Sequence, residues 1–169
     1  MENGLQVQVV GGGIAGLAAA LACAQSGANV HLCEQAAAIK EVGAGLQISP
    51  NGLAVLSRLG LKDAVADIAD RAEAVDLRDY KDGKLVCRLD LKAHASDLDF
   101  LLVHRADLIQ TLFQACKAQG VRFAFSQSLS SQDLLSGAFG SEAAASPVDL
   151  VIGADGVRCV CVSRDGGGF

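Results

Sequence analysis

The chain has 169 residues, of which 51% are hydrophobic and 20% are charged, and its formal net charge at pH 7 is −5. This length and composition are typical of a globular domain with a full hydrophobic core, and they exclude an intrinsically disordered chain. The acidic balance, without a cluster of lysine or arginine, argues against nucleic acid and anionic membrane surfaces as partners.

Residues 9–24 form the one segment apolar enough to be weighed as a membrane span or secretory signal. The segment is shorter than the roughly 20 residues that a span needs, glycines interrupt it, and no positively charged region precedes it. The cysteines form no CxxC pair and have no histidine at ligand spacing, so we expect buried free thiols, a cytoplasmic location and no metal site. They are Cys23, Cys33, Cys87, Cys116, Cys159 and Cys161.

The first part of the chain predicts a strand, a tight turn, a helix and a second strand. The apolar run 5–10 is typical of a buried strand, and 14–25 is typical of a helix that ends at Gly27. Residues 29–33 then form a second β-branched run. The whole stretch has the size of a βαβ unit, which favours a parallel sheet.

The next segment, 35–48, has no regular pattern, and we expect it to be irregular. Ser49 and Pro50 then match a helix N-cap followed by proline at the first helical position. Apolar residues at helical spacing continue to Gly60, and a further short helix is expected around 61–68.

Two alternating runs joined by a tight turn come next, at 75–80 and 85–89. Asp82-Gly83 lies between them, which is a strong hairpin signal. A hairpin at this point of an α/β chain indicates the start of a second sheet. The remaining predicted elements are a strand at 100–103, a helix from 108 to Gly120, a strand at 121–125, a polar loop or weak hairpin at 126–146 and a buried strand at 148–152.

The end of the first predicted strand and the start of the first predicted helix together match the pattern GxGxxG. Gly11 permits the tight turn, Gly13 lets a pyrophosphate approach the main chain, and Gly16 lets helix and strand pack closely. No lysine or arginine precedes Lys40. The unpaired N–H groups and partial positive charge of the helix N-terminus can nevertheless hold a diphosphate. A glycine-rich turn without a ligand is the structural alternative.

Glu34 lies at the end of the second predicted strand, about 20 residues after the glycines, where dinucleotide-binding folds place an acid. Its carboxylate can accept hydrogen bonds from ribose hydroxyls and would repel a 2′-phosphate. The expected adenosine is therefore that of FAD or NAD rather than NADP. A solvated strand end is the alternative interpretation of Glu34.

Four separated motifs occur in order between residues 7 and 158: GGGIAG with Glu34, GAGLQISPNG, HRADL and DLVIGADGVR. Together they resemble the FAD-dependent aromatic-ring monooxygenases, in particular the salicylate hydroxylase-like and hydroxybenzoate hydroxylase-like flavoproteins. The resemblance implies an α/β fold: a Rossmann-like FAD-binding domain with a parallel sheet and a GxGxxG βαβ unit, plus a partial antiparallel substrate-domain hairpin. It places the FAD-binding domain at 1–72 and 103–169 and the hairpin at 73–102.

The same resemblance assigns roles to matching positions. FAD would be the cofactor and NAD(P)H the co-substrate, and a flavin hydroperoxide would hydroxylate a small aromatic substrate. Arg105 would approach the phosphate or ribityl region of the flavin nucleotide, and Gln47 would lie near the flavin ring. The other implied cofactor-binding residues are Gly11, Gly13, Ile14, Ala15, Gly16 and Glu34 for the ADP half, and Gly153, Asp155 and Gly156 in the DG motif. No catalytic residue is assigned.

The chain also departs from the family pattern. Gln35 stands where relatives usually carry a basic residue, and the chain ends soon after the DG motif, where relatives continue. We therefore expect a truncated and marginally stable chain whose sheet keeps an open edge. Two other functions remain open at this point. One is an NAD-dependent dehydrogenase domain, and the other is a non-catalytic remnant that binds nucleotide weakly.

Overall fold

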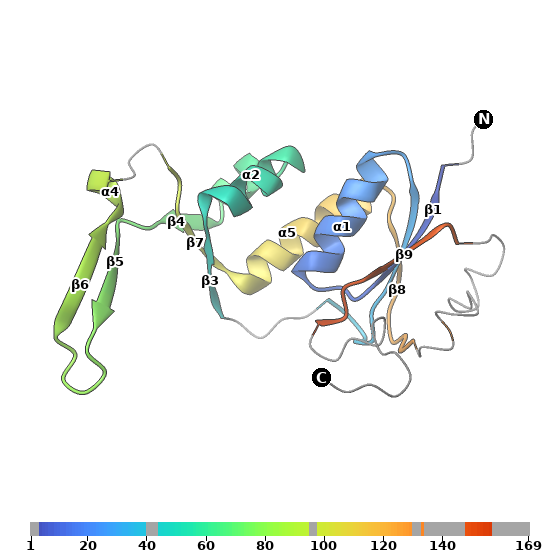
Figure 1. Ribbon diagram of the computed structural model, residues 1–169. Helices are drawn as coiled ribbons and strands as arrows, with labels where there is room; N and C mark the ends of the chain where they lie inside the picture. Colours follow the sequence, from blue (N-terminus) through green and yellow to red (C-terminus); the bar gives the residue numbers. More distant parts are fainter. Residues whose placement is uncertain (1–3, 40–43, 95–97, 130–132, 134–147, 157–169) are drawn as a thin grey trace. The chain divides into compact units, whose positions relative to one another are not determined.

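The computed structural model describes residues 4–39, 44–94, 98–129, 133 and 148–156. These residues form two compact units, shown along the chain in Figure 1. Met1–Glu41 and Ile109–Phe169 contribute to the first unit, and Val42–Leu108 forms the second.

The first unit contains a parallel sheet of four strands in the order β8-β2-β1-β9. All three strand pairs are parallel, as the βαβ pattern predicted. Strands β2 and β8 lie on one side of β1, and the later strand β9 lies on its other side. This reversal of the strand order creates a topological switch point beside β1. The strands are β1 (Gln6–Val10), β2 (Asn29–Cys33), β8 (Arg122–Ala124) and β9 (Leu150–Gly153).

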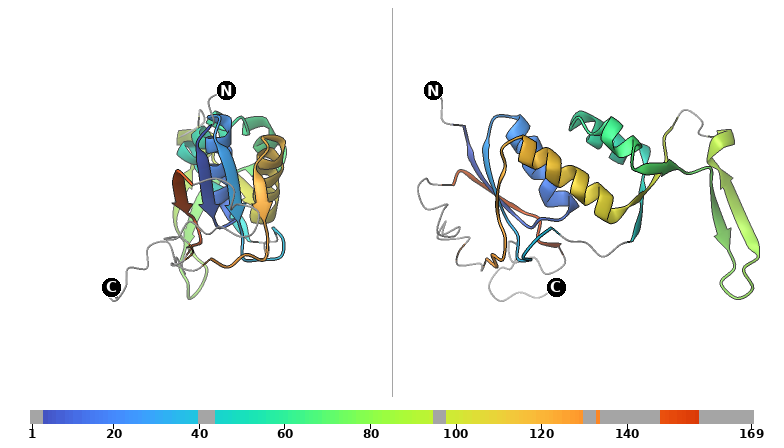
Figure 2. Two further views of the ribbon diagram at one scale, coloured as in Figure 1. Left: turned by 90° about the vertical axis from the view of Figure 1, so that its right-hand side faces the viewer. Right: turned by 180° about the vertical axis from the view of Figure 1, so that it is seen from behind.

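Helices α1 (Ile14–Gln25) and α5 (Arg105–Ala118) lie on the same side of this sheet, as Figures 1 and 2 show. The Cys116 thiol of α5 donates a hydrogen bond to the Leu17 carbonyl of α1 across 3.2 Å. The rings of Phe113 in α5 and Phe123 in β8 meet edge to face, with centroids 4.8 Å apart. The predicted bounds of α1 are confirmed, whereas α5 begins three residues before the predicted start.

Side-chain alternation gives the sheet two buried faces. Val9 and Leu32 share one face and have no exposed surface, as expected for the centre of a core. On the other face, Val10 and Cys33 pack against Leu129, which follows β8. At β1 and β2 both faces of the sheet are thus largely apolar, which is typical of parallel sheets. The edge strand β9 is mostly exposed, so the prediction of a buried strand at 148–152 is wrong.

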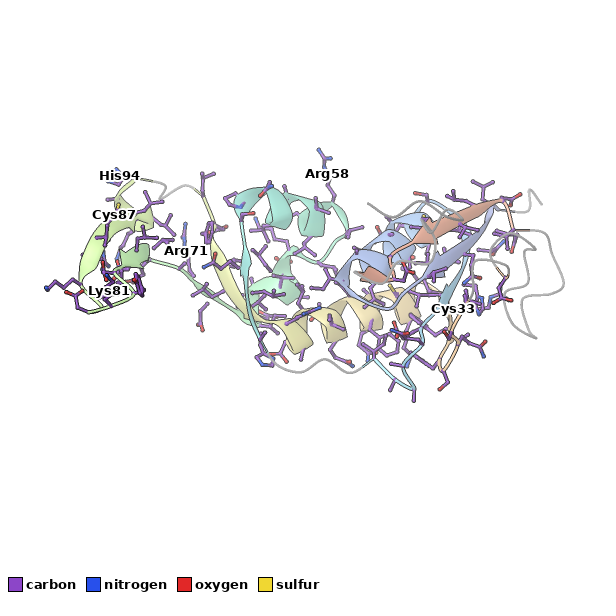
Figure 3. The ribbon with its side chains drawn as sticks, turned by 60° about the horizontal axis from the view of Figure 1, so that its bottom comes forward. Cys33, Arg58, Arg71, Lys81, Cys87 and His94 are labelled. Carbon is purple, nitrogen blue, oxygen red and sulfur yellow. The ribbon has the colours of Figure 1, made fainter. Side chains whose placement is uncertain are left out.

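The thiols differ in burial more than the sequence suggested. All four described cysteines are free; Cys33 and Cys116 are buried and Cys23 is half-buried. The prediction of buried thiols is wrong for Cys87, which is exposed on a two-stranded hairpin (Figure 3). Cys159 and Cys161 lie outside the described residues.

The second unit contains an antiparallel sheet in the order β3-β7-β4. Its strands are β3 (Gly45–Ile48), β7 (Leu101–His104) and β4 (Ala69–Arg71), with the helices α2 (Pro50–Arg58) and α3 (Lys62–Ala66) between β3 and β4. Helix α2 begins at Pro50 as predicted, but the Ser49 hydroxyl bonds to the side chain of Asn51 rather than to a backbone amide. Sequence reasoning missed β3 and β4, because strands this short show too little alternation to be recognised.

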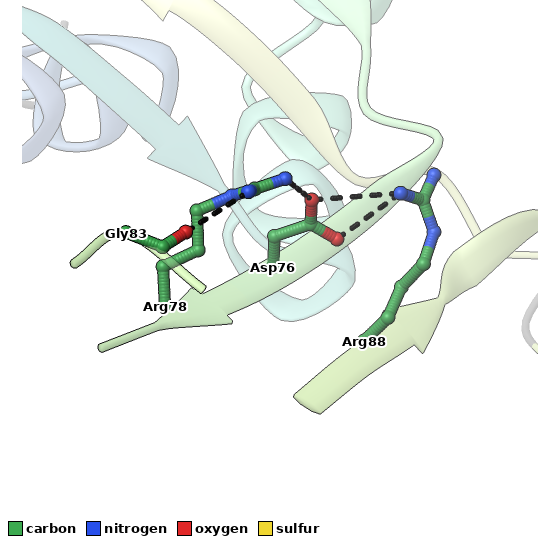
Figure 4. Close-up of polar contacts among 4 residues, drawn as sticks. All are labelled: Asp76, Arg78, Gly83 and Arg88. Carbon is green, nitrogen blue, oxygen red and sulfur yellow. Dashed lines mark hydrogen bonds and ion pairs between the residues drawn. The ribbon is translucent and has the colours of Figure 1, made fainter. Parts of the chain in front are cut away.

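The predicted hairpin is confirmed as β5 (Ala74–Arg78) and β6 (Leu85–Asp90), followed by the single turn α4 (Leu91–His94). Asp76 lies opposite Arg88 and accepts hydrogen bonds from Arg88 at 3.2 Å and from Arg78 at 2.9 Å (Figure 4). Both arginines are more than half exposed, so these ion pairs add little to stability.

The Cys116 thiol makes stability depend on pH. Burial raises the pKa of Cys116 to about 11, above the ordinary value of 9.0 that it has when the chain unfolds. The unfolded chain therefore loses the thiol proton at a lower pH than the folded chain does. The stabilisation of the folded chain by the protonated thiol is complete below about pH 9 and is lost as the pH rises toward 11.

We expect the free energy of unfolding to fall by roughly 2 kcal/mol more between pH 8 and pH 11 in the parent chain than in Cys116→Ala. Denaturant titrations at several pH values measure this difference. If the free energy of unfolding changed with pH in the same way in both chains, Cys116 would not be the source of the pH dependence.

Candidate cofactor site

The glycine turn after β1 is shaped by close approach of backbone to backbone. Gly11 has φ +106°, and a Cβ there would collide with the carbonyl group of Ala154, which follows β9. A Cβ on Gly16 would collide with the Gly11 carbonyl oxygen. The turn, the first helix and the end of β9 can meet only because these two positions lack side chains.

Gly13 differs from these two glycines, because its side-chain direction is open. It is the N-cap of α1 with extended backbone, and no atom lies within 4 Å of the position that a Cβ would take. The first helical hydrogen bond runs from the Leu17 N–H to the Gly13 carbonyl, so the N–H groups of Ile14, Ala15 and Gly16 have no intrahelical acceptor. The first turn carries no acidic side chain and no side-chain cap. The result is a cradle of amide donors.

A cavity of about 210 Å³ lies at the carboxyl ends of β1, β2 and β9, beside this turn. This is the switch point of the sheet, where open α/β folds bind their ligands. The cavity is lined by Val10, Gly11, Gly13, Cys33, Glu34, Gln35, Gln127, Ser128, Leu129, Ala154, Asp155 and Gly156. None of these lining residues has a basic side chain, so an anion here would meet backbone amides.

The Glu34 carboxylate is fixed by two backbone donors. One oxygen accepts the Gly12 N–H at 2.6 Å, and the other accepts the Ala36 N–H at 2.8 Å. A Cβ on Gly12 would lie 3.0 Å from the same carboxylate, so this glycine makes room for the acid. Each carboxylate oxygen keeps acceptor capacity for a ligand hydroxyl. Sequence reasoning gave Gly12 no role, although the middle glycine of the GGG run was the available signal.

The Gly-Asp-Gly segment lies on the opposite side of the glycine turn from Glu34. Gly153 is the last residue of β9 and pairs with Val10, and the Ala154 N–H donates to the Val10 carbonyl at 2.8 Å. Asp155 and Gly156 line the cavity, and Gly156 has φ +77°. Arg158, the last residue of the motif, lies outside the described residues.

Two of the predicted site residues belong to the second unit. Gln47 is exposed on β3, opposite Leu102 of β7. Arg105 is half-buried at the start of α5, and its N–H donates to the Ala44 carbonyl at 2.9 Å. Their contacts with a flavin remain predictions.

Sequence reasoning missed the wall that follows β8. Gln127, Ser128 and Leu129 line the cavity, and two hydrogen bonds of 3.0 Å hold this segment: the Ser126 N–H donates to Ala36, and the Gln127 N–H donates to Glu34. Ser126 takes the left-handed conformation, with φ +56°. The available signal was the position of these residues just after a parallel strand, because all the carboxyl ends meet at one edge.

The described part of the chain contains neither a cluster of metal ligands nor a membrane-spanning helix. Within it, no group of three or more His, Cys, Asp or Glu side chains is arranged to hold a metal ion. Within it too, no helix is long and apolar enough to cross a bilayer.

Comparison with known families identifies the fold. A family model described as an FAD binding domain matches residues 4–167. The chain belongs to this FAD-binding domain family. The parallel sheet and its glycine turn are thus those of a Rossmann-like FAD-binding fold.

Curated relatives include the 3-amino-4-hydroxybenzoate 2-monooxygenase of Streptomyces cremeus, which is 35% identical over 95% of this chain and 42% of its own length. The 6-hydroxynicotinate 3-monooxygenase of Bordetella bronchiseptica is 29% identical over 94% of this chain and 42% of its own length. A solved 2-methyl-3-hydroxypyridine-5-carboxylic acid oxygenase superposes with a TM-score of 0.76 at 27% identity, over 96% of this chain and 42% of that one. The FAD-binding domain described here thus spans less than half the length of these proteins.

The site residues fit the ADP half of FAD. The N-terminus of α1 suits a diphosphate, because Gly13 places no side chain in the space in front of the free amides. Glu34 suits a ribose diol, because its carboxylate is fixed and still able to accept hydrogen bonds.

Substitution by alanine should destabilise the chain at Gly16 more than at Gly13. Gly16→Ala should lower the free energy of unfolding by about 1–3 kcal/mol, because the Gly11 backbone must move. Gly13→Ala should cost less than about 1 kcal/mol, because its Cβ meets open space. Denaturant unfolding followed by circular dichroism measures both, and equal losses would contradict the distinction.

Proposed function

We propose that the ADP half of FAD binds in this cavity, with its diphosphate at the N-terminus of α1 and its adenosine ribose on Glu34. The observation that carries the proposal is the open Gly13 cradle, in the same cavity as a carboxylate that two amides hold in place. The amides of Gly13, Ile14, Ala15 and Gly16 would donate to the diphosphate oxygens. The Asp155 carboxylate would accept a hydrogen bond from a hydroxyl of the cofactor, while Gly153 and Gly156 would keep the backbone close to the cofactor.

The diphosphate would be bound by uncharged backbone groups rather than by basic side chains. Among the described residues that line the cavity none is basic, so the helix dipole and the oriented amides would carry the attraction. Glu34 and Gln35 lie at the edge that would meet the ribose. A carboxylate there disfavours a 2′-phosphate, which supports FAD rather than NADP as the resident nucleotide.

The second unit would serve the flavin end of the cofactor. Arg105 would meet the phosphate or ribityl chain, and Gln47 would lie near the ring. The hairpin β5–β6 would belong to the substrate region, with domain bounds near 72 and 103. These assignments follow the order of the motifs along the chain.

We infer that the parent activity is hydroxylation of a small aromatic ring, with FAD as the cofactor and NAD(P)H and O₂ as co-substrates. The curated relatives named above are monooxygenases of ring compounds, which supports this class. Bound FAD would supply the redox chemistry, while the residues of this chain bind and orient it. An NAD-dependent dehydrogenase is not favoured, because the matching family binds FAD. We also expect the cytoplasmic location that the cysteine content suggested.

Substitution of Glu34 tests the cofactor site. Glutamine offers one acceptor oxygen where the structure needs two, so its NH₂ group would face the N–H of Gly12 or Ala36. We expect Glu34→Gln to weaken FAD binding about 10- to 100-fold in calorimetric titrations.

Glu73→Gln is the matched control, because it removes the same charge from an exposed position in the other unit. The control should bind FAD like the parent chain. Absence of FAD binding by the folded parent would contradict the proposed function, and equal affinity in Glu34→Gln would contradict the ribose role alone.

The reaction class is tested with FAD-loaded protein, NAD(P)H and a panel of small aromatic acids. A hydroxylated product identified by mass spectrometry supports the assignment. Oxidation of NAD(P)H with release of hydrogen peroxide alone, for every ring compound, would contradict it.

A further inference from the structure

Gln8 is the one polar residue among those the structure describes that is buried in the protein interior. It lies in the middle of β1 between valines and is 1% exposed. An amide placed in an apolar core costs free energy unless its donor and acceptor groups are satisfied. Its partners therefore indicate what the side chain is for.

The Gln8 amide joins β1 to two positions of β2. Its nitrogen lies 3.2 Å from the Val9 carbonyl oxygen and 3.2 Å from the Cys33 sulfur, and its oxygen lies 3.0 Å from Nδ1 of His31. The carbonyl can only accept, so the nitrogen of the amide must face it. Its oxygen is then left for His31, whose Nδ1 carries the hydrogen.

Cys33 is the point at which both parts of the cofactor site attach to β2. The Cys33 carbonyl accepts the Gly11 N–H at 2.8 Å, which anchors the start of the glycine turn. The next residue is Glu34, whose carboxylate accepts the Gly12 N–H. Cys33 also lines the cavity, and Figure 3 shows it among the strands of the parallel sheet. A shift of Cys33 would therefore move the turn and the acid together.

The chemistry of the thiol suits this contact. Burial raises the pKa of Cys33, while the hydrogen bond from Gln8 acts in the opposite direction. A protonated thiol keeps sulfur lone pairs that accept the amide hydrogen.

We propose that Gln8 is a positioning residue for the cofactor site. Its amide holds Cys33, and through Cys33 it holds the glycine turn and Glu34 in the geometry that receives the ADP half of FAD. Leucine has a similar size and would suit an apolar strand, so packing alone does not explain the amide. The inference rests on the proposed FAD binding, and the experiment separates the two.

The test compares Gln8→Leu with Gln6→Leu. Gln6 lies two residues earlier on the same face of β1, and its side-chain amide donates to the Gly4 carbonyl, away from the cavity. FAD affinity is measured by calorimetry at a temperature where circular dichroism shows each variant folded. We expect Gln8→Leu to bind FAD about tenfold more weakly and Gln6→Leu to bind within about twofold of the parent. A purely structural role would lower the melting temperature of Gln8→Leu and leave the affinity of the folded protein unchanged.

A second pair of variants keeps the proposal falsifiable if Gln8→Leu fails to fold. Cys33→Ala removes the acceptor of the Gln8 amide, whereas Cys33→Ser retains one. We expect FAD to bind more weakly to the alanine variant than to the serine variant. In the double variant Gln8→Leu/Cys33→Ala, the two losses should not add, because both break the same contact.

The outcomes are distinct. If the parent and Gln6→Leu bind FAD and Gln8→Leu binds equally well, or if Cys33→Ala matches Cys33→Ser, the positioning role is overturned and the FAD site stands. If the folded parent and Gln6→Leu both fail to bind FAD, the proposed function itself is overturned.

Discussion

The contact between three backbone segments at Gly11 is the constraint on which the site depends. Gly11 lies against the backbone that follows β9, and Gly16 lies against the carbonyl of Gly11. These contacts fix where α1 begins relative to β1 and β9, and hence where its free amides point. A side chain at either position would separate the segments and move the cradle of donors. The chemistry of the site is therefore set by the absence of side chains.

Hydrogen bonds then tie the acidic side of the cavity to this turn. Glu34 accepts an N–H from the turn itself and another from the segment that follows β2. The segment after β8 bonds in turn to the backbone of Glu34 and Ala36. The glycine turn, the Glu34 carboxylate and the cavity wall are thus joined in one hydrogen-bond network. In such a network, a buried amide such as that of Gln8 can affect ligand geometry without touching the ligand.

In the proposed site an anion would be held without a basic side chain among the described lining residues. A helix N-terminus offers about half a positive charge and several aligned donors, which suits a diphosphate at close range. A fixed carboxylate nearby lowers the affinity for additional negative charge on the sugar. In the proposed binding mode this combination would select a nucleotide with a free ribose diol, and Gln35 would leave the charge balance unchanged because it is uncharged.

The sequence by itself determined the elements whose signals are local. The β1–α1–β2 unit, the start of α2 at Pro50 and the turn at Gly83 each depend on residues within a few positions of one another. Gly11, Gly13, Gly16 and Glu34 could be singled out for the same reason, because their spacing follows from one strand, one helix and the next strand. The short strands β3 and β4 escaped prediction because three or four residues carry no clear alternation.

Only the tertiary structure decided which distant segments meet. Alternation shows that a strand is buried but does not say which strand lies beside it, so the order β8-β2-β1-β9 could not be read from the pattern. The cavity wall at 127–129, the Gly12 amide on Glu34 and the contacts of Gln8 with His31 and Cys33 all depend on that order. They join residues that are far apart in the chain, and such contacts are fixed by packing of the whole sheet rather than by local propensity.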